Sequence, residues 1–323
     1  MLDPARSYDL IGDVHGCANT LEHLLDVLGY RLQGGVWRHP RRQAVFLGDI
    51  IDRGPRIREA LHIVHGMVEA GEAFCIMGNH EYNALGWHTR APAGTGQTWV
   101  REHTPRHRRL FGATLEQFER HPDDWKAFVG WFYTLPLFVD AGRFRLVHAC
   151  WDQALVDPLK AMFPNACVDE PFIQQSALPG SFAAQAFDRL LRGTDMRLPG
   201  GRTLTGGDGL TRAFFRTKFW EQDPQTYGDI VFQPDALPDE VASQRLSPDQ
   251  KQALLCYGAH EPMLFVGHYW RDGHPAPLRP NLACLDYSAV LHGKLVAYRL
   301  DAETAIDPHK FVWVDVKRPE LAP

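Results

Sequence analysis

The sequence lacks several features that would place it in particular classes of protein. Its six cysteines form no CxxC pair and four of them lie in or beside apolar runs, which indicates buried, reduced thiols. The first ten residues, MLDPARSYDL, have no basic start followed by an apolar segment, so we expect no signal peptide. No apolar run reaches the length that spans a bilayer. These absences favour a cytoplasmic protein that needs no membrane.

The chain also lacks an excess of positive charge. Its formal net charge is −5, which disfavours a protein whose main task is to coat nucleic acid. The 323 residues are 45% hydrophobic and 23% charged, typical of a globular protein with a sizeable core. We find no internal repeat and no low-complexity segment.

Five short apolar runs predict buried strands, and each ends at a polar cluster. They are YDLI, AVFL, AFCIM, FRLV and MLFV, at residues 8–11, 44–47, 73–77, 144–147 and 263–266. The segments between the first three runs, residues 18–30 and 57–71, have apolar residues at helical spacing, and Gly29 is a plausible helix stop. This alternation predicts a parallel sheet covered by helices, and in such sheets ligands bind at the carboxyl ends of the strands.

The rest of the chain follows other patterns. Residues 88–135 are predicted to be helical, whereas residues 155–260 contain many Pro and Gly and show no clean periodicity. We interpret about 83–135 and about 155–260 as insertions that form the walls of the active-site cleft within a single domain, residues 1–323. The C-terminal part is predicted to be rich in β-strands, with hairpins turning at LHG and near DAET.

The polar clusters at the predicted strand ends contain residue types that bind metal ions. In chain order these residues are Asp13, His15, Asp49, Asp52, Arg53, Asn79, His80, Glu81, His148 and His268. Oxygen and imidazole ligands without thiolates suit Mn, Fe or Zn, and two ions about 3.5–4 Å apart can clamp a phosphoryl group. Each cluster has an ordinary alternative: GNHE could cap a helix with Asn79, and His148 could be a hydrogen-bonded core residue.

Taken together, the motifs resemble those of the calcineurin-like metallophosphoesterases. The matching motifs are GDVHG at 12–16, GDIIDRG at 48–54, GNHE at 78–81, the strand-end His148 and the later GH at 267–268. The DRG and GNHE forms are most similar to the phosphoprotein-phosphatase branch and its bacterial relatives. The resemblance implies an α/β fold, with a metallophosphoesterase-type β-sandwich flanked by helices.

The resemblance also implies two divalent metal ions, with Mn favoured and Fe or Zn as alternatives. In the family pattern Asp13 and His15 bind one ion and Asp49 bridges to the other. The ligands of the second ion are completed by Asn79, His148 and His268. Trp270 stands where many members have a further histidine, so the first ion is expected to keep fewer protein ligands and more water.

In the reaction that the resemblance implies, a hydroxide held between the ions attacks phosphorus in line. His80 protonates the leaving oxygen and Asp52 orients His80. Arg53 binds the phosphoryl oxygens with its planar fork, or alternatively makes a structural salt bridge.

A second phosphate-binding cation cannot be assigned from the motifs, because Met77 stands where an Arg usually precedes GNHE. The candidates are Arg192, Arg212, Arg216 and Lys218. We favour Arg216 for substrate binding because aromatic residues surround it, and the alternative is an exposed helix charge. The basic stretch at residues 101–110 is either a rim that attracts an anionic substrate or a solvated helix face.

These residues predict a metal-dependent phosphomonoesterase acting on phosphoproteins or small phosphate esters. The alternative is a hydrolase of nucleotide phosphoanhydrides or phosphodiesters, such as a diadenosine tetraphosphatase or an enzyme that processes RNA ends. Asp52 and Glu81 argue against the tetraphosphatase assignment. A third hypothesis is a non-catalytic metal-binding scaffold. The expected partner is a phosphorylated substrate, and the sequence gives no expectation for the oligomeric state.

Overall fold

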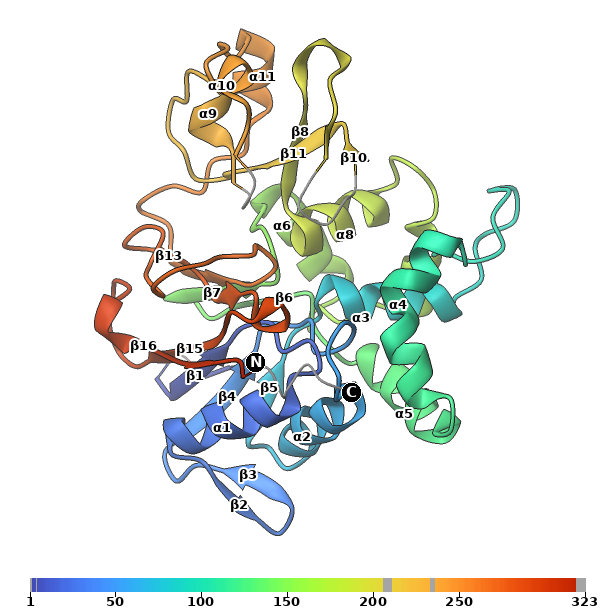
Figure 1. Ribbon diagram of the computed structural model, residues 1–323, viewed down its shortest axis with the longest axis vertical. Coiled ribbons are helices and arrows are strands. Elements are labelled where there is room, and N and C mark those ends of the chain that lie inside the picture. Colours follow the sequence, from blue (N-terminus) through green and yellow to red (C-terminus); the bar gives the residue numbers. More distant parts are fainter. Residues whose placement is uncertain (1, 4, 206–210, 233–235, 318–323) are drawn as a thin grey trace.

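Two β-sheets pack face to face in the computed structural model, which describes residues 2–3, 5–205, 211–232 and 236–317 (Figure 1). The first sheet has the strand order β14-β15-β1-β4-β5, with β16 paired to β15. Its strands are β1 (Ser7–Ile11), β4 (Arg42–Phe46), β5 (Ala73–Cys75), β14 (Asp286–Tyr287), β15 (Lys294–Leu300) and β16 (Phe311–Asp315). β1, β4 and β5 run parallel, and β15 is antiparallel to β1.

The second sheet has the order β13-β12-β7-β6, with β7, β12 and β13 parallel to one another. Its strands are β6 (Phe138–Asp140), β7 (Phe144–Val147), β12 (Met263–Val266) and β13 (Leu282–Cys284). All five predicted strands are therefore present, three in the first sheet and two in the second. The mixed α/β class and the two-sheet arrangement agree with the fold class predicted from the sequence.

Side chains of β1 alternate between the two faces of the first sheet. Tyr8 and Leu10 lie in the core between the sheets together with Phe144 and Leu146 of β7. Ile11 belongs to the other core, which lies beneath the helices. Since successive side chains of a strand point to opposite faces, this register lets one sheet bury both of its sides.

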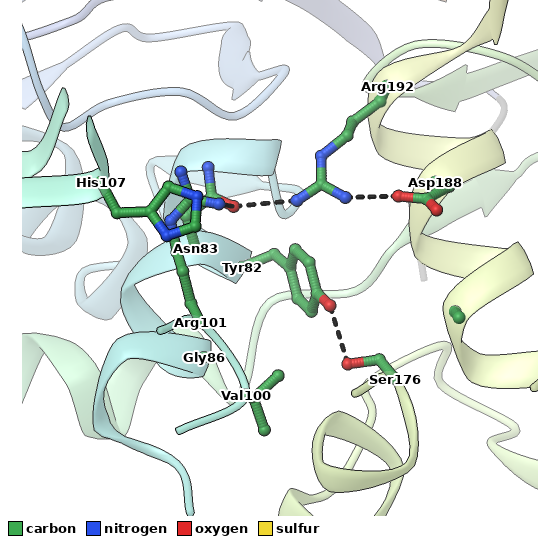
Figure 2. Close-up of a pocket in the computed structure, with 10 residues that line it drawn as sticks. Tyr82, Asn83, Gly86, Val100, Arg101, His107, Ser176, Asp188 and Arg192 are labelled. Carbon is green, nitrogen blue, oxygen red and sulfur yellow. Dashed lines mark hydrogen bonds and ion pairs between the residues drawn. The ribbon is translucent and has the colours of Figure 1, made fainter. Parts of the chain in front are cut away.

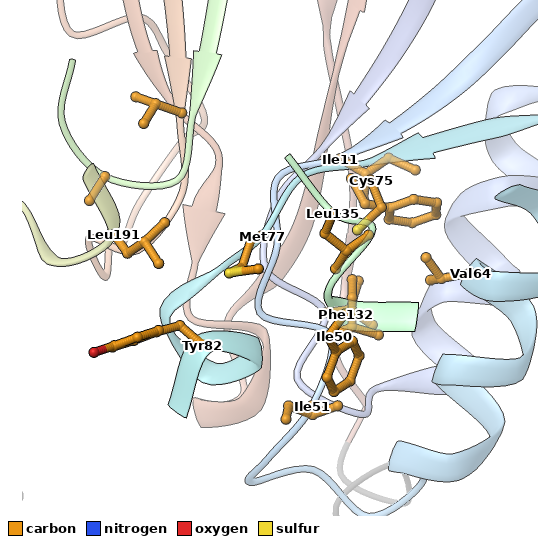
Figure 3. Close-up of a cluster of buried hydrophobic side chains, with 14 of the residues drawn as sticks. Ile11, Ile50, Ile51, Val64, Cys75, Met77, Tyr82, Phe132, Leu135 and Leu191 are labelled. Atoms are coloured by element: carbon orange, nitrogen blue, oxygen red, sulfur yellow. The ribbon is translucent and has the colours of Figure 1, made fainter. Parts of the chain in front are cut away.

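The outer face of the first sheet is covered by α1 (Ala18–Leu28) and α2 (Ile57–Glu69), which sit below it in Figure 1. Gly29 ends α1 with a φ of 97°, a conformation that glycine adopts without steric cost, which confirms the predicted stop. Figure 3 shows Val64 of α2 facing Cys75 and Leu135 in this core. A small hairpin, β2 (Arg31–Gln33) and β3 (Val36–Arg38), follows α1.

The segment predicted to be helical, residues 88–135, is helical only in part. It contains the end of α3 (Asn79–His88), then α4 (Pro105–Phe118) and α5 (Pro122–Phe132). Residues 89–104 form no helix, and the prediction was wrong there. Pro92, Gly94 and Gly96 lie in this stretch, and both glycines have positive φ, which is incompatible with a continuous α-helix.

Residues 155–260 contain more regular structure than the sequence suggested, although 206–210 and 233–235 lie outside the described residues. The helices of this region are α6 (Gln153–Met162), α7 (Glu170–Gln175), α8 (Phe182–Arg192), α9 (Tyr227–Ile230), α10 (Asp239–Ala242) and α11 (Pro248–Ala253). Its strands are β8 (Thr194–Arg197), β9 (Leu204–Thr205), β10 (Thr211–Arg212) and β11 (Phe214–Thr217). It also contains the 3-10 turn η1 (Pro199–Gly201). The expectation of no periodicity was wrong for α8, where Ala183, Ala186, Phe187 and Leu190 are buried at helical spacing.

The C-terminal residues form the predicted hairpins. β14 and β15 pair across the 3-10 turn η2 (Ala289–Leu291), and β15 pairs with β16 after a connection that contains η3 (Pro308–Lys310). Among the described residues, no helix is both long enough and apolar enough to cross a membrane. The division of the chain into one domain with two insertions stays a prediction.

Leu10→Ala should destabilise the fold by about 2–5 kcal/mol, because Leu10 is fully buried between the sheets and its removal leaves a cavity. Leu32→Ala is the matched control, since Leu32 is 59% exposed and should change the unfolding free energy by about 0.5 kcal/mol or less. Equilibrium unfolding in urea measures both values. Equal effects of the two substitutions would contradict the core described here.

Candidate metal centre

Loops from the carboxyl ends of strands in both sheets meet at one place. Asp13 and His15 follow β1, Asp49 follows β4, and Asn79 begins α3 just beyond β5. From the second sheet, His148 follows β7 and His268 follows β12. All six predicted metal ligands are buried, with side chains drawn together from residues 13–268.

The Asp49 carboxylate lies at the centre of this group. Its Oδ2 is 3.3 Å from His148 Nε2, 3.6 Å from His15 Nε2 and 3.8 Å from His80 Nε2. Its Oδ1 accepts a hydrogen bond of 2.9 Å from the backbone N–H of His80. One oxygen is thus fixed by the backbone, and the other faces three imidazole rings.

Backbone carbonyl groups fix which nitrogen of two histidines faces Asp49. His15 Nδ1 lies 2.8 Å from the Ile51 carbonyl oxygen, and His148 Nδ1 lies 2.7 Å from that of Leu47. Since a carbonyl oxygen can only accept, Nδ1 carries the proton in each ring. In a neutral ring the Nε2 lone pair then points toward Asp49, which is how a metal-binding histidine is held in place.

Asn79 and His268 complete the group on the side of the second sheet. Asn79 Oδ1 lies 2.7 Å from His268 Nδ1 and 3.2 Å from His148 Nε2. The buried Nε2 of His268 has no hydrogen-bond partner within the described part of the chain. The backbone N–H of His268 donates to Asp13 Oδ2 over 3.1 Å, which places Asp13 next to this histidine.

Two sets of buried side chains are arranged so that each could hold a metal ion. The sets are His15, Asp49, His80 and Asp49, His148, His268, and the candidate ligand atoms within each lie no more than 4.8 Å apart. Asp49 belongs to both sets, as a bridging ligand would. The first set differs from the predicted one, because it contains His80 in place of Asp13. The roles of Asp13 and His80 therefore stay predictions.

The electrostatics of the site suit a bound cation. Burial and the nearby Asp286 and Asp49 carboxylates raise the pKa of Asp13 well above its usual range. Although burial opposes it, the Asp49 carboxylate raises the pKa of His148 to about 10. Without a metal, a proton on His148 thus balances the buried negative charge, and a divalent cation would take over that role. The residues present fit a pair of metal ions.

Asp286 is a further buried carboxylate that the sequence analysis missed. It is the first residue of β14 and lies two positions beyond β13, one of the three parallel strands of the second sheet. The residue is 2% exposed. Its Oδ1 accepts a hydrogen bond from the Ser288 N–H, whereas its buried Oδ2 has no partner among the described residues. Like the other site residues, Asp286 follows a short apolar strand. The same strand-end pattern therefore marks it in CLDY, residues 284–287.

Tight backbone turns hold the site residues. His15, Asp49, Asp52, Arg53 and His268 have φ angles between 44° and 70°, a region that residues other than glycine seldom adopt. Such conformations cost free energy and persist only where the surrounding structure enforces them. A Cβ atom on Gly48 would lie 2.4 Å from the backbone nitrogen of Gly78, so these two turns can touch only because both are glycine.

Glu81 ties two of these turns together. Its carboxylate accepts hydrogen bonds from the N–H groups of Gly78, Asp49 and Ile50 over 3.0, 2.8 and 2.8 Å. Gly78 is the N-cap residue of α3, and Glu81 lies in the first turn of that helix. GNHE thus does start a helix, and the Asn79 side chain is left to contact His148 and His268.

His80, a member of the first candidate set, forms a buried pair with Asp52. His80 Nδ1 lies 2.5 Å from Asp52 Oδ2, and the hydroxyl group of Thr114 donates to Asp52 Oδ1 over 2.5 Å. The N–H of Asp52 in turn donates to Thr114 Oγ1 over 3.2 Å. Thr114 lies on α4, far from every motif, and nothing in the sequence pointed to it.

Arg53 points toward His80, with Nη2 3.4 Å from His80 Nε2. Its guanidinium carbon lies 4.6 Å from the ring centre of Trp270, within the range of a cation–π contact. Among the described residues Arg53 forms no salt bridge, so the structural alternative lacks its carboxylate partner. Trp270 thus contacts the predicted phosphate-binding arginine.

Arg216 lies beside the second metal-binding set. It is on β11, its Nη1 donates to the His268 carbonyl oxygen over 3.4 Å, and its guanidinium carbon lies 5.9 Å from the Tyr269 ring centre. The alternative of an exposed helix charge was wrong, because Arg216 is a partly buried strand residue.

The other candidate cations lie elsewhere. Arg192 hydrogen-bonds Asn83, Lys218 lies 3.5 Å from Glu221, and Arg212 is an exposed residue of β10. In the basic stretch, Arg106, Arg108 and Arg109 are exposed on α4 as a solvated helix face would be, whereas Arg101 is partly buried.

The chain is similar to known proteins of one family. Residues 8–167 match the family model described as calcineurin-like phosphoesterase. A bis(5'-nucleosyl)-tetraphosphatase PrpE of Oceanobacillus iheyensis is 48% identical over 73 residues, which are 22% of this chain and 29% of that protein. The PrpE of Bacillus subtilis is 41% identical over 75 residues, or 23% of this chain and 31% of that protein. The match therefore spans less than a third of the length of these relatives.

Among solved structures, the chain aligns with a protein serine/threonine phosphatase of Saccharomyces cerevisiae. The alignment covers 97% of this chain and 80% of that chain, with 13% sequence identity and a TM-score of 0.47. A structure described as a putative diadenosine tetraphosphatase aligns over 96% of this chain and 94% of that chain, with 15% identity and a TM-score of 0.46. Both likenesses are too distant to inform the chemistry of the site.

Asp49→Asn should lower the bound metal at both positions, because Asp49 belongs to both sets and an amide is a weaker ligand than a carboxylate. Elemental analysis of Mn-loaded, desalted protein measures the number of ions per chain. Asp26→Asn is the control, since the Asp26 side chain is 61% exposed and pairs with Arg31 at the surface. An Asp49→Asn protein that still holds two ions would contradict the bridging role.

Proposed function

We propose that this chain, whose residues 8–167 match the family model described as calcineurin-like phosphoesterase, is a metal-dependent hydrolase of phosphate monoesters. The observation that carries this proposal is the Asp49 carboxylate, shared by two sets of buried metal-binding side chains beside the His80–Asp52 pair. The substrates that we propose are phosphoproteins or small phosphate esters.

The proposed ligands are Asp13, His15 and Asp49 for one ion and Asp49, Asn79, His148 and His268 for the other. When bound, two divalent cations, Mn in preference to Fe or Zn, would polarise the phosphoryl oxygens and make a water molecule nucleophilic near neutral pH. The free Nε2 of His268 and the clustered carboxylates support this assignment.

His80 is the proposed general acid. The Asp52 carboxylate accepts a hydrogen bond of 2.5 Å from the Nδ1–H group of His80, and the Thr114 hydroxyl group donates to the other oxygen of Asp52. This contact fixes the ring and directs its Nε2 atom toward the centre of the site. A histidine held in this way can donate its Nε2 proton to a leaving oxygen.

Arg53 is proposed to bind the phosphoryl group. Its Nη2 lies next to His80 Nε2, and its guanidinium group rests on the Trp270 ring. The planar fork can donate two parallel hydrogen bonds to phosphate oxygens, and the contact with Trp270 reduces the entropy that binding would cost. Arg216 is a second proposed phosphate ligand, supported by its contact with the His268 carbonyl group.

A second candidate function is the hydrolysis of nucleotide phosphoanhydrides. It is favoured by the names of the curated relatives, which are bis(5'-nucleosyl)-tetraphosphatases, although the matches cover less than a third of their length. Both functions use the same metal centre and the same acid, and they differ in what the leaving group carries. We also propose a cytoplasmic location, which the six free cysteines support.

A panel of substrates with added Mn tests these proposals. It contains p-nitrophenyl phosphate, bis-p-nitrophenyl phosphate, phosphopeptides and diadenosine tetraphosphate. Hydrolysis of the monoesters supports the first proposal, and activity on diadenosine tetraphosphate alone would replace it by the second. A chain that binds Mn and hydrolyses none of them would be the metal-binding scaffold.

His80→Ala should lower kcat by about 10²–10⁴-fold, the usual effect of losing a general acid, and should leave the metal content unchanged. Parallel measurements of turnover and bound Mn separate an acid from a ligand, which matters because His80 lies in one of the two metal-binding sets. Full activity would show that another group donates the proton. Loss of metal would show that His80 is a ligand.

Arg53→Lys should lower kcat/KM for p-nitrophenyl phosphate by about tenfold or more despite the retained charge, because lysine cannot reproduce the planar fork. Arg56→Lys is the control, since the Arg56 side chain is 38% exposed and pairs with Glu59 at the surface. Steady-state kinetics on both proteins measures the effect. Identical constants for Arg53→Lys and the wild type would mean that Arg53 is structural.

A further inference from the structure

A cavity of about 180 Å³ lies along α3, next to the candidate active site. Figure 2 shows Arg101 and Arg192 converging on Asn83, with His107 close to Arg101. We call this cavity the Arg101–Arg192 pocket. It is smaller than the pockets of about 300–1,000 Å³ that enclose drug-sized ligands, so it suits a single chemical group. Two guanidinium groups and an imidazole among its walls, against the single carboxylate of Asp188, indicate that this group is an anion.

The two arginines of the pocket have little negative charge to balance them. Arg101 Nη1 and Arg192 Nη2 donate to the same neutral oxygen, Asn83 Oδ1, over 2.8 and 2.9 Å. Arg192 also pairs with Asp188, whose side chain is 66% exposed, and no described carboxylate forms a salt bridge with Arg101. Burial and the charge of Arg192 lower the pKa of Arg101 to about 10. Like charges held together in this way are stabilised when an anion binds between them.

The pocket is also rigid before any ligand arrives. The guanidinium carbon of Arg192 lies 5.3 Å from the ring centre of Tyr82, which stacks on Phe187 at 4.0 Å. The Tyr82 hydroxyl group donates to Ser176 Oγ over 2.7 Å. On the other side, the backbone N–H of Arg101 donates to the Gly86 carbonyl oxygen over 3.0 Å. Side chains fixed in this manner lose little entropy on binding.

The position of the pocket relates it to the leaving group. Asn83 follows His80 by three residues on α3, roughly 4.5 Å along the helix axis. The Asp52 carboxylate, which holds His80, is close enough to raise the pKa of Arg101 against the larger effect of burial. The pocket therefore adjoins the acid side of the site, where the proposed function places the departing oxygen.

We propose that the Arg101–Arg192 pocket binds a second phosphate carried by the leaving group of the substrate, as in a nucleoside polyphosphate. The assignment to the leaving group rests on the second candidate function, the hydrolysis of nucleotide phosphoanhydrides, whereas the binding of an anion does not. Two phosphates of one polyphosphate chain share an oxygen, so few rotatable bonds separate them. Two phosphorylated side chains of a peptide would have to be ordered to do so, at a greater entropy cost.

The kinetic test compares substrates with and without the second phosphate, using the Mn-loaded full chain. Arg101→Met and Arg192→Met should each raise KM for diadenosine tetraphosphate about tenfold or more, since each loses a charge-assisted hydrogen bond. Both variants should keep kcat/KM for p-nitrophenyl phosphate within about twofold of the wild-type value. Arg109→Gln removes an exposed charge of the same basic stretch and should change neither substrate.

Asn83→Asp is a second variant that keeps the shape of the pocket and gives both arginines a carboxylate partner. It should raise KM for diadenosine tetraphosphate about tenfold without lowering the melting temperature, which separates loss of the anion site from misfolding. Calorimetric titration with inorganic pyrophosphate provides a readout that needs no turnover. Each of the three variants should bind pyrophosphate about tenfold more weakly than the wild type.

Four other outcomes would overturn the proposal or one part of it. Unchanged pyrophosphate affinity in all three variants would overturn the proposal. An equal loss with p-nitrophenyl phosphate would also overturn it, because the arginines would then bind the scissile phosphate. A doubly phosphorylated peptide that depends on both arginines, while diadenosine tetraphosphate does not, would overturn the polyphosphate assignment. Arginine-dependent pyrophosphate binding without any turnover would support the anion site and refute the proposed function.

Discussion

The site depends on one buried carboxylate that two groups of candidate metal ligands share. Asp49 Oδ1 is fixed by the His80 N–H, which leaves Oδ2 facing the imidazole rings of His15, His80 and His148. A lone carboxylate in this position would be costly to bury, and the raised pKa of His148 shows how strongly it attracts positive charge. The Glu81 carboxylate, which accepts a hydrogen bond from the Asp49 N–H, and the close approach of Gly48 to Gly78 hold the turn that carries this oxygen.

The two-sheet fold brings this carboxylate to its partners. Asp49 and Asn79 follow neighbouring parallel strands of the first sheet, whereas His148 and His268 follow neighbouring parallel strands of the second. The shared core of Tyr8, Leu10, Phe144 and Leu146 therefore also aligns the two halves of the site. Because interiors are close-packed, a shift of one sheet against the other would separate the ligands. Stability and chemistry depend on the same contacts.

Much of this arrangement could be predicted from the sequence, because the strand-end residues are encoded locally. The apolar runs before Asp13, Asp49 and His148 define strands, and the family motifs identify their order. Thr114 could not be predicted, since its contact with Asp52 spans 62 positions and no motif marks it. The Arg101–Arg192 pocket was also hidden, because Asn83, Arg101 and Arg192 meet only through tertiary packing. By contrast, the apolar spacing of α8 is present in the sequence, but the helix is short and is flanked by Pro179, Gly180 and Gly193, residues typical of loops.

The central claim is that Asp49 bridges two cations. A crystal structure of the Mn-loaded protein, with the ions located by anomalous scattering, tests it most directly. We predict two peaks about 3.5–4 Å apart with the Asp49 carboxylate contacting both. A single peak, or two peaks of which only one contacts Asp49, would contradict the account.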